Sequence, residues 1–404
     1  MRKINTRTFQ RATRTTQRDI NRRILLNLIR DHQPVSRTEL ARRMDVSLGA
    51  VKPIIDELLE SGTVVEGETA DTPRGRKPRL LHIRTRDRYA VAVDVRLGRT
   101  TVALTDFDFR QLAVESFETP ADPDGLVERL AVSVGRLLEG RSGTHEGVGV
   151  IVPGMVDRRT GRVVYSPQLG WRDANIRAPL AEATGLRVMI ENAPLACAIG
   201  EIWFPQSLGP DQDSFVYVAV SDGVGTGLVL NGELVRGHKE TAGEFGHLPL
   251  DINGPRCLCG LQGCLEAYTS NLSTLARYLE WDYSDPGTLE RLRHAELGII
   301  DLIRLAAGGD ERAKAALRES ARYLGYGIAG VITAFSPAAV IVGGEIIGAW
   351  GVIGETVRRA VRERTLTGTA ASTPILPAST EGASRLRGAT ALLVALSFRA
   401  PDVI

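Results

Sequence analysis

Hydrophobic residues in the first eighty positions recur at three- and four-residue intervals in three consecutive segments, which is the spacing of amphipathic helices. The apolar positions are Ile20, Ile24, Leu25, Leu28 and Ile29 in the first segment, Leu40, Ala41 and Met44 in the second, and Leu48, Val51, Ile55 and Leu58 in the third. Two short runs typical of β-strands follow at 63–66 and 80–83. Three helices and a two-stranded ribbon predict a winged helix-turn-helix over residues 17–86, preceded by a flexible basic arm over residues 1–16.

Two local signals bear on the ends of these helices. Ser36 and Glu39 have the spacing of a capping box, so we expect Ser36 to cap the second helix and Glu39 to reach back to the cap. Pro53 falls inside the third helix, where proline deletes a backbone hydrogen bond. The sequence therefore predicts either a kink at Pro53 or a helix that starts later than Leu48.

The third helix of such a domain enters the major groove of DNA by its N-terminus, and small or hydroxyl residues there permit close approach to the backbone. The wing is rich in proline and arginine and resembles an AT-hook core with a lysine inserted, which suits a narrow minor groove. A solvated linker between domains would have the same composition. The candidate DNA-binding residues are Ser36, Arg37, Ser47, Gly49, Ala50, Lys52, Arg74, Arg76 and Lys77.

From residue 87 onwards the pattern changes to that of an α/β domain. Buried strands are predicted at 89–95, 100–105, 111–117 and 148–152, with a helix at 124–139, and strands return at 215–220, 227–229 and 339–342 around a long helix at 312–334. Two similar halves imply a duplicated fold over residues 87–404, with a cleft between two lobes that can hold a ligand. The long helix and a C-terminal helix at 382–398 are candidate surfaces for a homodimer or a dimer of dimers.

Charge separates the two parts of the chain. Residues 1–88 hold 20 Lys+Arg and 11 Asp+Glu, a net charge of +9, whereas the remaining residues hold 30 and 37, a net charge of −7. A basic module attached to an acidic body suggests an anionic polymer such as DNA as the partner of the first part. The chain has no apolar run of membrane-spanning length and no secretory signal, so we expect a cytoplasmic protein without a membrane partner.

Three of the four cysteines, Cys257, Cys259 and Cys264, lie within eight residues, and His247 precedes them by ten. Three thiolates and an imidazole form a tetrahedral ligand set that suits a structural Zn²⁺. Gly260 would let the loop fold back so that the sulfurs face one point. A disulfide or a chance cluster are the alternatives, and scarce cysteine argues against the disulfide.

Several motifs of the large domain resemble the ROK family (repressors, open reading frames, kinases), in its transcriptional-repressor branch. The matching segments are Pro153-Gly154, Ser166–Trp171, Glu191-Asn192, Gly243–His247 and the cysteine loop closing in Cys264-Leu265-Glu266. Together with the winged helix, the resemblance covers nearly the whole chain. It implies a duplicated actin-like, sugar-kinase-type fold with a structural zinc loop.

The resemblance also implies a sugar site. Carried over by position, the residues that bind the effector are Gly154, Gln168, Asn192, Glu244, His247 and Glu266. Carboxylates and amides have the fixed hydrogen-bonding geometry that distinguishes one arrangement of hydroxyls from another. Gln168 stands where the family usually carries Asn, which leaves the identity of the sugar open.

ROK kinases carry an Asp directly after the Asn of the Glu-Asn motif as the general base, and here that position is Ala193. The first phosphate-binding turn of the kinases, Asp-x-Gly-Gly-Thr, is replaced by residues 94–100, in which the side chains of Arg96 and Leu97 would obstruct a phosphate. In the second turn, Asp222 would repel phosphate. Three changes in independent segments argue against transfer of phosphate from ATP and hence against an enzyme.

The sequence therefore predicts a sugar-responsive transcriptional regulator, most simply a repressor, which binds operator DNA and an unphosphorylated sugar. One alternative is an active ROK sugar kinase fused to a DNA-binding module. Another is a regulator for which Zn²⁺ itself is the signal. A protein partner that sequesters the regulator also remains open.

Overall fold

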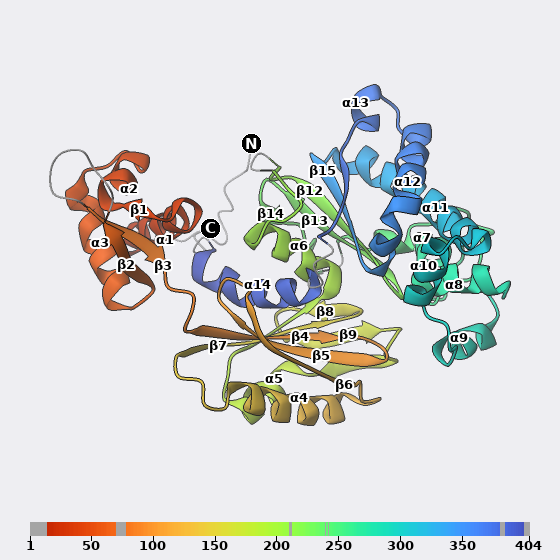
Figure 1. Ribbon diagram of the computed structural model, residues 1–404, viewed down its shortest axis with the longest axis horizontal. Coiled ribbons are helices and arrows are strands. Elements are labelled where there is room, and N and C mark those ends of the chain that lie inside the picture. The colour runs from red at the N-terminus through yellow and green to blue at the C-terminus, as the bar shows by residue number, and fades with distance from the viewer. Residues whose placement is uncertain are drawn as a thin grey trace.

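The computed structural model describes residues 14–69, 78–209, 212–238, 240, 242–379 and 384–399. Three parts follow one another along the chain: a winged helix, a first lobe and a second lobe (Figure 1). Within this described part, no helix is both long enough and apolar enough to cross a membrane.

The N-terminal part is a winged helix-turn-helix. Its elements are α1 (Arg14–His32), β1 (Val35–Ser36), α2 (Arg37–Arg43), α3 (Leu48–Glu60), β2 (Val64–Thr69) and β3 (Arg79–Ile83). The strands form a small antiparallel sheet in the order β1-β3-β2. The apolar core of this domain is built from all three helices and the ribbon, which explains the predicted helical spacing, and Phe107, Val394 and Phe398 of the large domain complete it.

Local details of this domain confirm some expectations and correct others. Ser36 caps α2, because its Oγ accepts a hydrogen bond from the Glu39 backbone at 3.2 Å. The Glu39 side chain instead binds Arg42 at 2.6 Å. Helix α3 begins at Leu48 and runs through Pro53, so the alternative of a later start is wrong. Leu48, predicted to be buried, is 47% exposed, because the first turn of α3 projects beyond the core.

The two lobes share one sheet topology, as the repeated sequence pattern predicts. In the first sheet the order is β11-β7-β4-β5-β6, and in the second it is β14-β13-β12-β15-β16. In each, the first three strands along the chain form an antiparallel meander, and the other two add in parallel beside its first strand.

The first lobe contains β4 (Arg88–Val95), β5 (Arg99–Asp106), β6 (Gln111–Glu118), α4 (Pro123–Leu138), β7 (Thr144–Val152), α5 (Arg177–Thr184) and β11 (Val188–Asn192). A small antiparallel sheet is inserted in it, formed by β8 (Met155–Asp157), β9 (Arg162–Ser166) and β10 (Trp171–Asn175). Helices α4 and α5 cover one face of the five-stranded sheet with aliphatic side chains.

The second lobe contains β12 (Phe215–Val220), β13 (Val224–Leu230), β14 (Glu233–Leu234), η1 (Phe245–His247), α7 (Leu265–Thr269), α8 (Asn271–Leu279), α9 (Pro286–Arg293), α10 (Ile299–Ala307), α11 (Glu311–Phe335), β15 (Ala339–Gly343), η2 (Glu345–Ala349), α12 (Trp350–Arg364), α13 (Gly368–Ala371) and β16 (Ile375–Pro377). Its largest apolar core lies between the second sheet and helices α7, α8 and α10–α12.

Helices α6 (Ala193–Trp203) and α14 (Ser384–Phe398) lie between the two five-stranded sheets (Figure 1). Helix α14 packs against β4 and β7 of the first sheet, and α6 packs against β12 and β13 of the second. Nearly all of α14 is therefore buried within the chain. The prediction that this helix offers a dimer surface is wrong, because its apolar side chains are already covered by the first sheet and α6.

The winged helix packs against the last turn of α14. Phe398 packs into the winged-helix core, and its carbonyl accepts a hydrogen bond from Asn27 of α1 at 2.8 Å. Arg30 of α1 lies over the ring of Trp203 at 4.7 Å. The DNA-binding domain is thus docked on the helices that separate the lobes.

Candidate functional site

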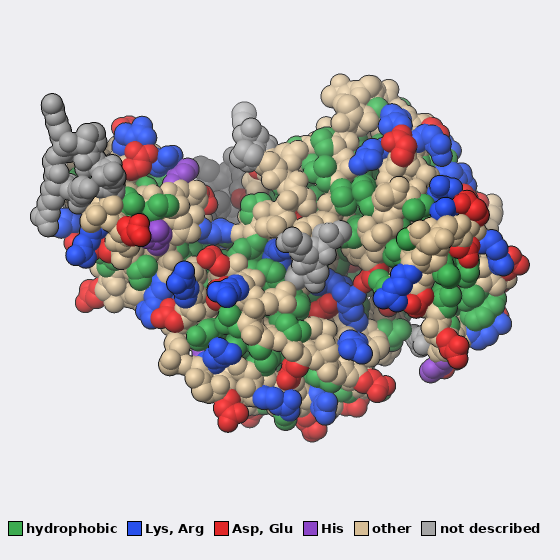
Figure 2. Space-filling view, viewed as in Figure 1, with side chains coloured by type: hydrophobic (Ala, Val, Ile, Leu, Met, Phe, Trp, Pro, Cys, Tyr) green, Lys and Arg blue, Asp and Glu red, His purple; other side chains and the backbone are tan. Residues whose placement is uncertain are grey.

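A cavity of about 450 Å³ lies between the two lobes, and side chains from both lobes line it. All six residues predicted to bind an effector lie on its wall: Gly154, Gln168 and Asn192 from the first lobe, and Glu244, His247 and Glu266 from the second. Figure 2 shows acidic and basic side chains interspersed over the visible face of the large domain, with no single-sign patch. The tertiary structure thus gathers into one site six residues that are spread over 113 positions of the sequence.

The first lobe positions its residues at the ends of parallel strands. Gly154 follows β7 with a φ of +101°, and a Cβ there would lie 2.3 Å from the carbonyl oxygen of Tyr165, so only glycine fits. Asn192 ends β11 and caps α6, because its Oδ1 accepts a hydrogen bond from the Leu195 backbone at 3.1 Å. The cap uses the amide oxygen of Asn192, which leaves its Nδ2 as a donor for a ligand.

The second lobe supplies the carboxylates. Glu266 is 3% exposed, and its Oε2 accepts a hydrogen bond from the Val224 backbone at 2.8 Å. Glu244 precedes η1, and its Oε2 lies 4.0 Å from His247 Nε2. Burial raises the pKa of Glu244 above its ordinary value, and the neighbouring Glu266 raises it further. A neutral ligand that donates hydroxyl protons would satisfy these acceptors without adding charge.

Side chains from both lobes lie close to Gly223. A Cβ at this position would lie 2.5 Å from Nε2 of Gln168 and 2.8 Å from Oε2 of Glu266. Gln168 therefore reaches from the first lobe to the turn between β12 and β13. Its longer side chain fills space that the absent Cβ of Gly223 leaves open.

The four predicted metal ligands form one cluster beside the cavity. The ligand atoms of His247, Cys257, Cys259 and Cys264 all lie within 4.8 Å of one another. The Cys259 and Cys264 sulfurs are 3.7 Å apart, close to the roughly 3.8 Å that two thiolates have on one tetrahedral Zn²⁺ with bonds of about 2.3 Å. The residues present therefore fit a metal ion with soft ligands.

The electrostatics of the cluster also favour a cation. Burial, together with the carboxylate of Glu266, raises the pKa of the Cys257 thiol, and burial raises that of Cys264 to about 11. A divalent cation would supply the charge that stabilises the thiolates. His247 has Nδ1 3.9 Å from the Cys257 sulfur, while its Nε2 faces Glu244, so one imidazole can belong to both sites.

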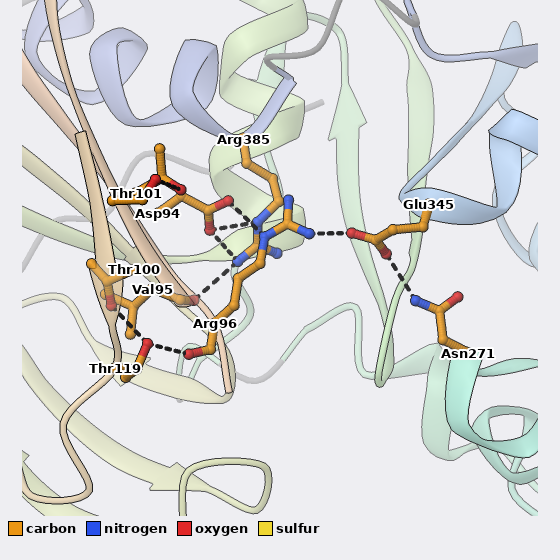
Figure 3. Close-up of polar contacts among 10 residues, drawn as sticks. Asp94, Val95, Arg96, Thr100, Thr101, Thr119, Asn271, Glu345 and Arg385 are labelled. Carbon is orange, nitrogen blue, oxygen red and sulfur yellow. Dashed lines mark hydrogen bonds and ion pairs between the residues drawn. The ribbon is translucent and has the colours of Figure 1, made fainter. Parts of the chain in front are cut away.

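The segment that replaces the first phosphate turn holds a network of ion pairs that sequence reasoning missed (Figure 3). Arg96 binds Asp94 at 2.8 Å and also binds Glu345 of the second lobe. Arg385, at the start of α14, binds Asp94 at 2.6 Å. The two-residue spacing of Asp94 and Arg96 could have suggested their pairing, but no sequence signal pointed to Glu345 or Arg385.

The other two altered kinase segments pack against each other. Ala193, at the position of the expected base, is buried at the first turn of α6. A Cβ on Gly225 would lie 2.6 Å from Cγ of Pro194, so the glycine turn closes directly onto α6. The glycine at this position therefore serves close packing against α6.

The predicted DNA-contacting residues of α3 are accessible. Ser47, Gly49, Ala50 and Lys52 are all exposed at or near the N-terminus of this helix. Ser36 is occupied as the cap of α2, and Arg37 binds Glu66 at 2.8 Å. The wing residues Arg74, Arg76 and Lys77 lie outside the described residues.

Comparisons with known proteins agree with this arrangement. Residues 90–395 match the ROK family, and residues 18–65 match the winged helix-turn-helix DNA-binding family. The chain is 28% identical to the xylose repressor of Bacillus subtilis over 91% of this chain and 93% of that protein.

Two solved structures are also similar. The crystal structure of a ROK family transcriptional regulator, a homologue of the Escherichia coli Mlc protein, has a TM-score of 0.79 at 24% identity and covers 95% of this chain and 97% of its own. A ROK family glucokinase from Streptomyces griseus, in complex with glucose and AMPPNP, has a TM-score of 0.66 at 27% identity. It covers 75% of this chain and 98% of its own.

Proposed function

This chain belongs to the ROK family, and we propose that it is a transcriptional repressor that binds operator DNA through its winged helix and an unphosphorylated sugar between its lobes. The observation that carries the proposal is the cavity. All six residues expected to bind the sugar line it. Ala193 stands where the kinases of the family carry their general base. The relative named xylose repressor supports a carbohydrate as the signal.

The metal cluster has a structural part in this proposal. Four protein ligands would complete the tetrahedral coordination of Zn²⁺ and leave no open position for catalysis. The cysteine loop leads directly from Cys264 into α7, which carries Glu266. Zinc would therefore fix the loop that places His247 and Glu266 at the cavity.

Helix α14 offers a physical connection between the sugar site and the DNA-binding domain. Arg385 in its first turn binds Asp94 at the cleft, and Phe398 in its last turn packs against the winged helix. A sugar that binds one arrangement of the lobes better than another would shift the position of the winged helices in a dimer. Because half-sites lie about one helical turn or a multiple apart, a small displacement would change operator affinity.

Replacing the exposed Lys52 on α3 is expected to weaken DNA binding about equally on all sequences. Lys52→Ala should also lower the dependence of log affinity on log salt by about one, because one phosphate contact is lost. The measurement is a salt titration of fluorescence anisotropy, on a duplex selected in vitro for binding the full-length protein. Lys314→Ala, on α11 of the second lobe, is the matched control. If the salt dependence of Lys52→Ala equals that of the unaltered protein, Lys52 of α3 does not contact a DNA phosphate.

An assay for phosphoryl transfer separates the repressor from an active sugar kinase. The full-length protein with ATP, Mg²⁺ and a panel of monosaccharides is expected to release no ADP above the sugar-free background, because Ala193 cannot accept a proton. A ROK glucokinase serves as the positive control. Sugar-dependent ADP release at ordinary kinase rates would contradict the proposed function.

A further inference from the structure

The ion pairs around Arg96 join the first lobe to the second across the cleft (Figure 3). On the side of the first lobe, buried Asp94 at the end of β4 receives Arg96 Nε at 2.8 Å and Arg385 Nε at 2.7 Å. Burial alone would raise the pKa of Asp94, but the charges of Arg385 and Arg96 outweigh burial and hold it below its usual value. Asp94 is thus an ionised anchor that fixes the direction of the Arg96 side chain.

In the second lobe, Oε1 of Glu345, at the start of η2, accepts a hydrogen bond from Nη1 of Arg96. Its Oε2 accepts a hydrogen bond from Asn271 Nδ2 at 2.9 Å. The backbone of Asn271 in turn donates to the carbonyl of Ser221, at 2.8 Å, in the turn after β12. Glu345 is therefore held within its own lobe, so movement of one lobe away from the other would have to break the contact between Arg96 and Glu345.

A second ion pair crosses between the lobes at a different strand. Glu191, at the end of β11 in the first lobe, binds Arg236 of the second lobe at 2.6 Å. Arg236 follows β14 and lies on the segment that leads to Glu244 and His247. Both side chains are largely buried, at 4% and 18% exposed, so solvent screens this pair less than a surface pair.

We propose that the pairs Arg96–Glu345 and Glu191–Arg236 form a latch that holds the two lobes together across the cleft. The four residues come from four separate segments, and each pair has one member in each lobe. Arg96 and Glu345 also line the cavity between the lobes, although neither pair includes a residue predicted to bind the sugar or the metal. The latch concerns closure of the lobes themselves, and it goes beyond the proposed function.

Cys197 offers a direct measure of this closure. It lies on α6 at the wall of a second cavity, of about 550 Å³, which Arg96, Glu345 and Arg385 also line. The cysteine is 3% exposed, so we expect a thiol reagent to reach it faster when the lobes around this cavity separate. The rate of labelling then reports the population of the open form.

The test uses the full-length protein without sugar or DNA, with labelling of Cys197 by a maleimide followed by peptide mass spectrometry. Glu345→Gln and Arg236→Gln are each expected to accelerate labelling about tenfold, because each loses one charge-assisted contact across the cleft. Small-angle scattering should show a larger radius of gyration for the double variant. Glu115→Gln, whose pair with Arg136 lies within the first lobe, is the matched control.

Two outcomes decide the matter. Faster labelling and expansion in the latch variants, with circular dichroism unchanged, support the latch. Labelling rates equal to that of Glu115→Gln in both single variants and in the double variant overturn it. If a single variant fails to fold, the other variant gives the same test. Since no sugar or DNA is present, the result is independent of whether the protein proves to be a sugar-responsive repressor.

Discussion

Cys257→Ser is expected to remove the metal, abolish sugar binding and lower the melting temperature of the large domain by about 10 °C. The loop that carries the cysteines has few apolar contacts of its own, since its small cluster consists of Cys257, Cys264 and Ala267 with two partly buried neighbours. Without a cation, the remaining Cys264 thiol stays protonated, because burial raises its pKa to about 11, and the loop loses the metal that ties it together. Metal content by mass spectrometry, calorimetric melting and sugar titration measure the three effects.

The fourth cysteine provides the control for this experiment. Cys197→Ala alters a buried cysteine of α6 outside the cluster and should keep both the metal and the sugar response. The apolar core of the winged helix, as the structure describes it, contains no residue of the cysteine loop, so DNA binding by Cys257→Ser without sugar should be retained. Normal sugar binding by a metal-free Cys257→Ser protein would contradict the proposed structural role of zinc. If operator affinity instead follows zinc reversibly while the protein stays folded, the metal is the signal.

Asn192→Ala and Glu244→Ala are expected to weaken sugar binding from opposite sides of the cavity while leaving DNA binding in the absence of sugar intact. Loss of the Glu244 carboxylate removes a hydrogen bond to a charged acceptor, which corresponds to a roughly 10- to 100-fold lower affinity. Loss of Asn192 removes a neutral donor and should cost about tenfold. Isothermal titration with a sugar first found by thermal-shift screening of mono- and disaccharides checks both values.

Two further variants separate sugar contact from stability. Asn192 also caps α6, so its replacement by alanine should destabilise the protein by about 1 kcal/mol. Asn192→Asp keeps a capping oxygen but loses the amide donor, and it should bind sugar weakly without this loss of stability. Glu118→Gln, on an exposed part of β6, is the control for Glu244. Full sugar affinity in Glu244→Ala would remove this carboxylate from the proposed site.

Local sequence patterns predicted most of the helices and strands because their signals are short-range. The alternation and spacing of apolar residues predicted β4, β5, β6, α4, β12 and α11 with ends that agree with the structure to within one residue. The same reasoning failed for Leu48, since periodicity shows which side of a helix is apolar but not how far the core extends along it. It also failed for α14. We expected this apolar helix to form a dimer surface, but the first sheet and α6 of the same chain bury it.

The sequence by itself predicted the two-part organisation and the winged helix, because these rest on the periodicity of apolar residues within short segments. It indicated the candidate metal ligands through their residue types and spacing, and the residues expected at the sugar site through the resemblance to the ROK family. Only the tertiary structure decided what occupies the altered phosphate segment. Arg96 and Glu345 are 249 positions apart, and nothing in either local sequence indicates that they meet. Their pairing depends on how two sheets face each other across a cleft, which is fixed by the packing of α6 and α14 between them.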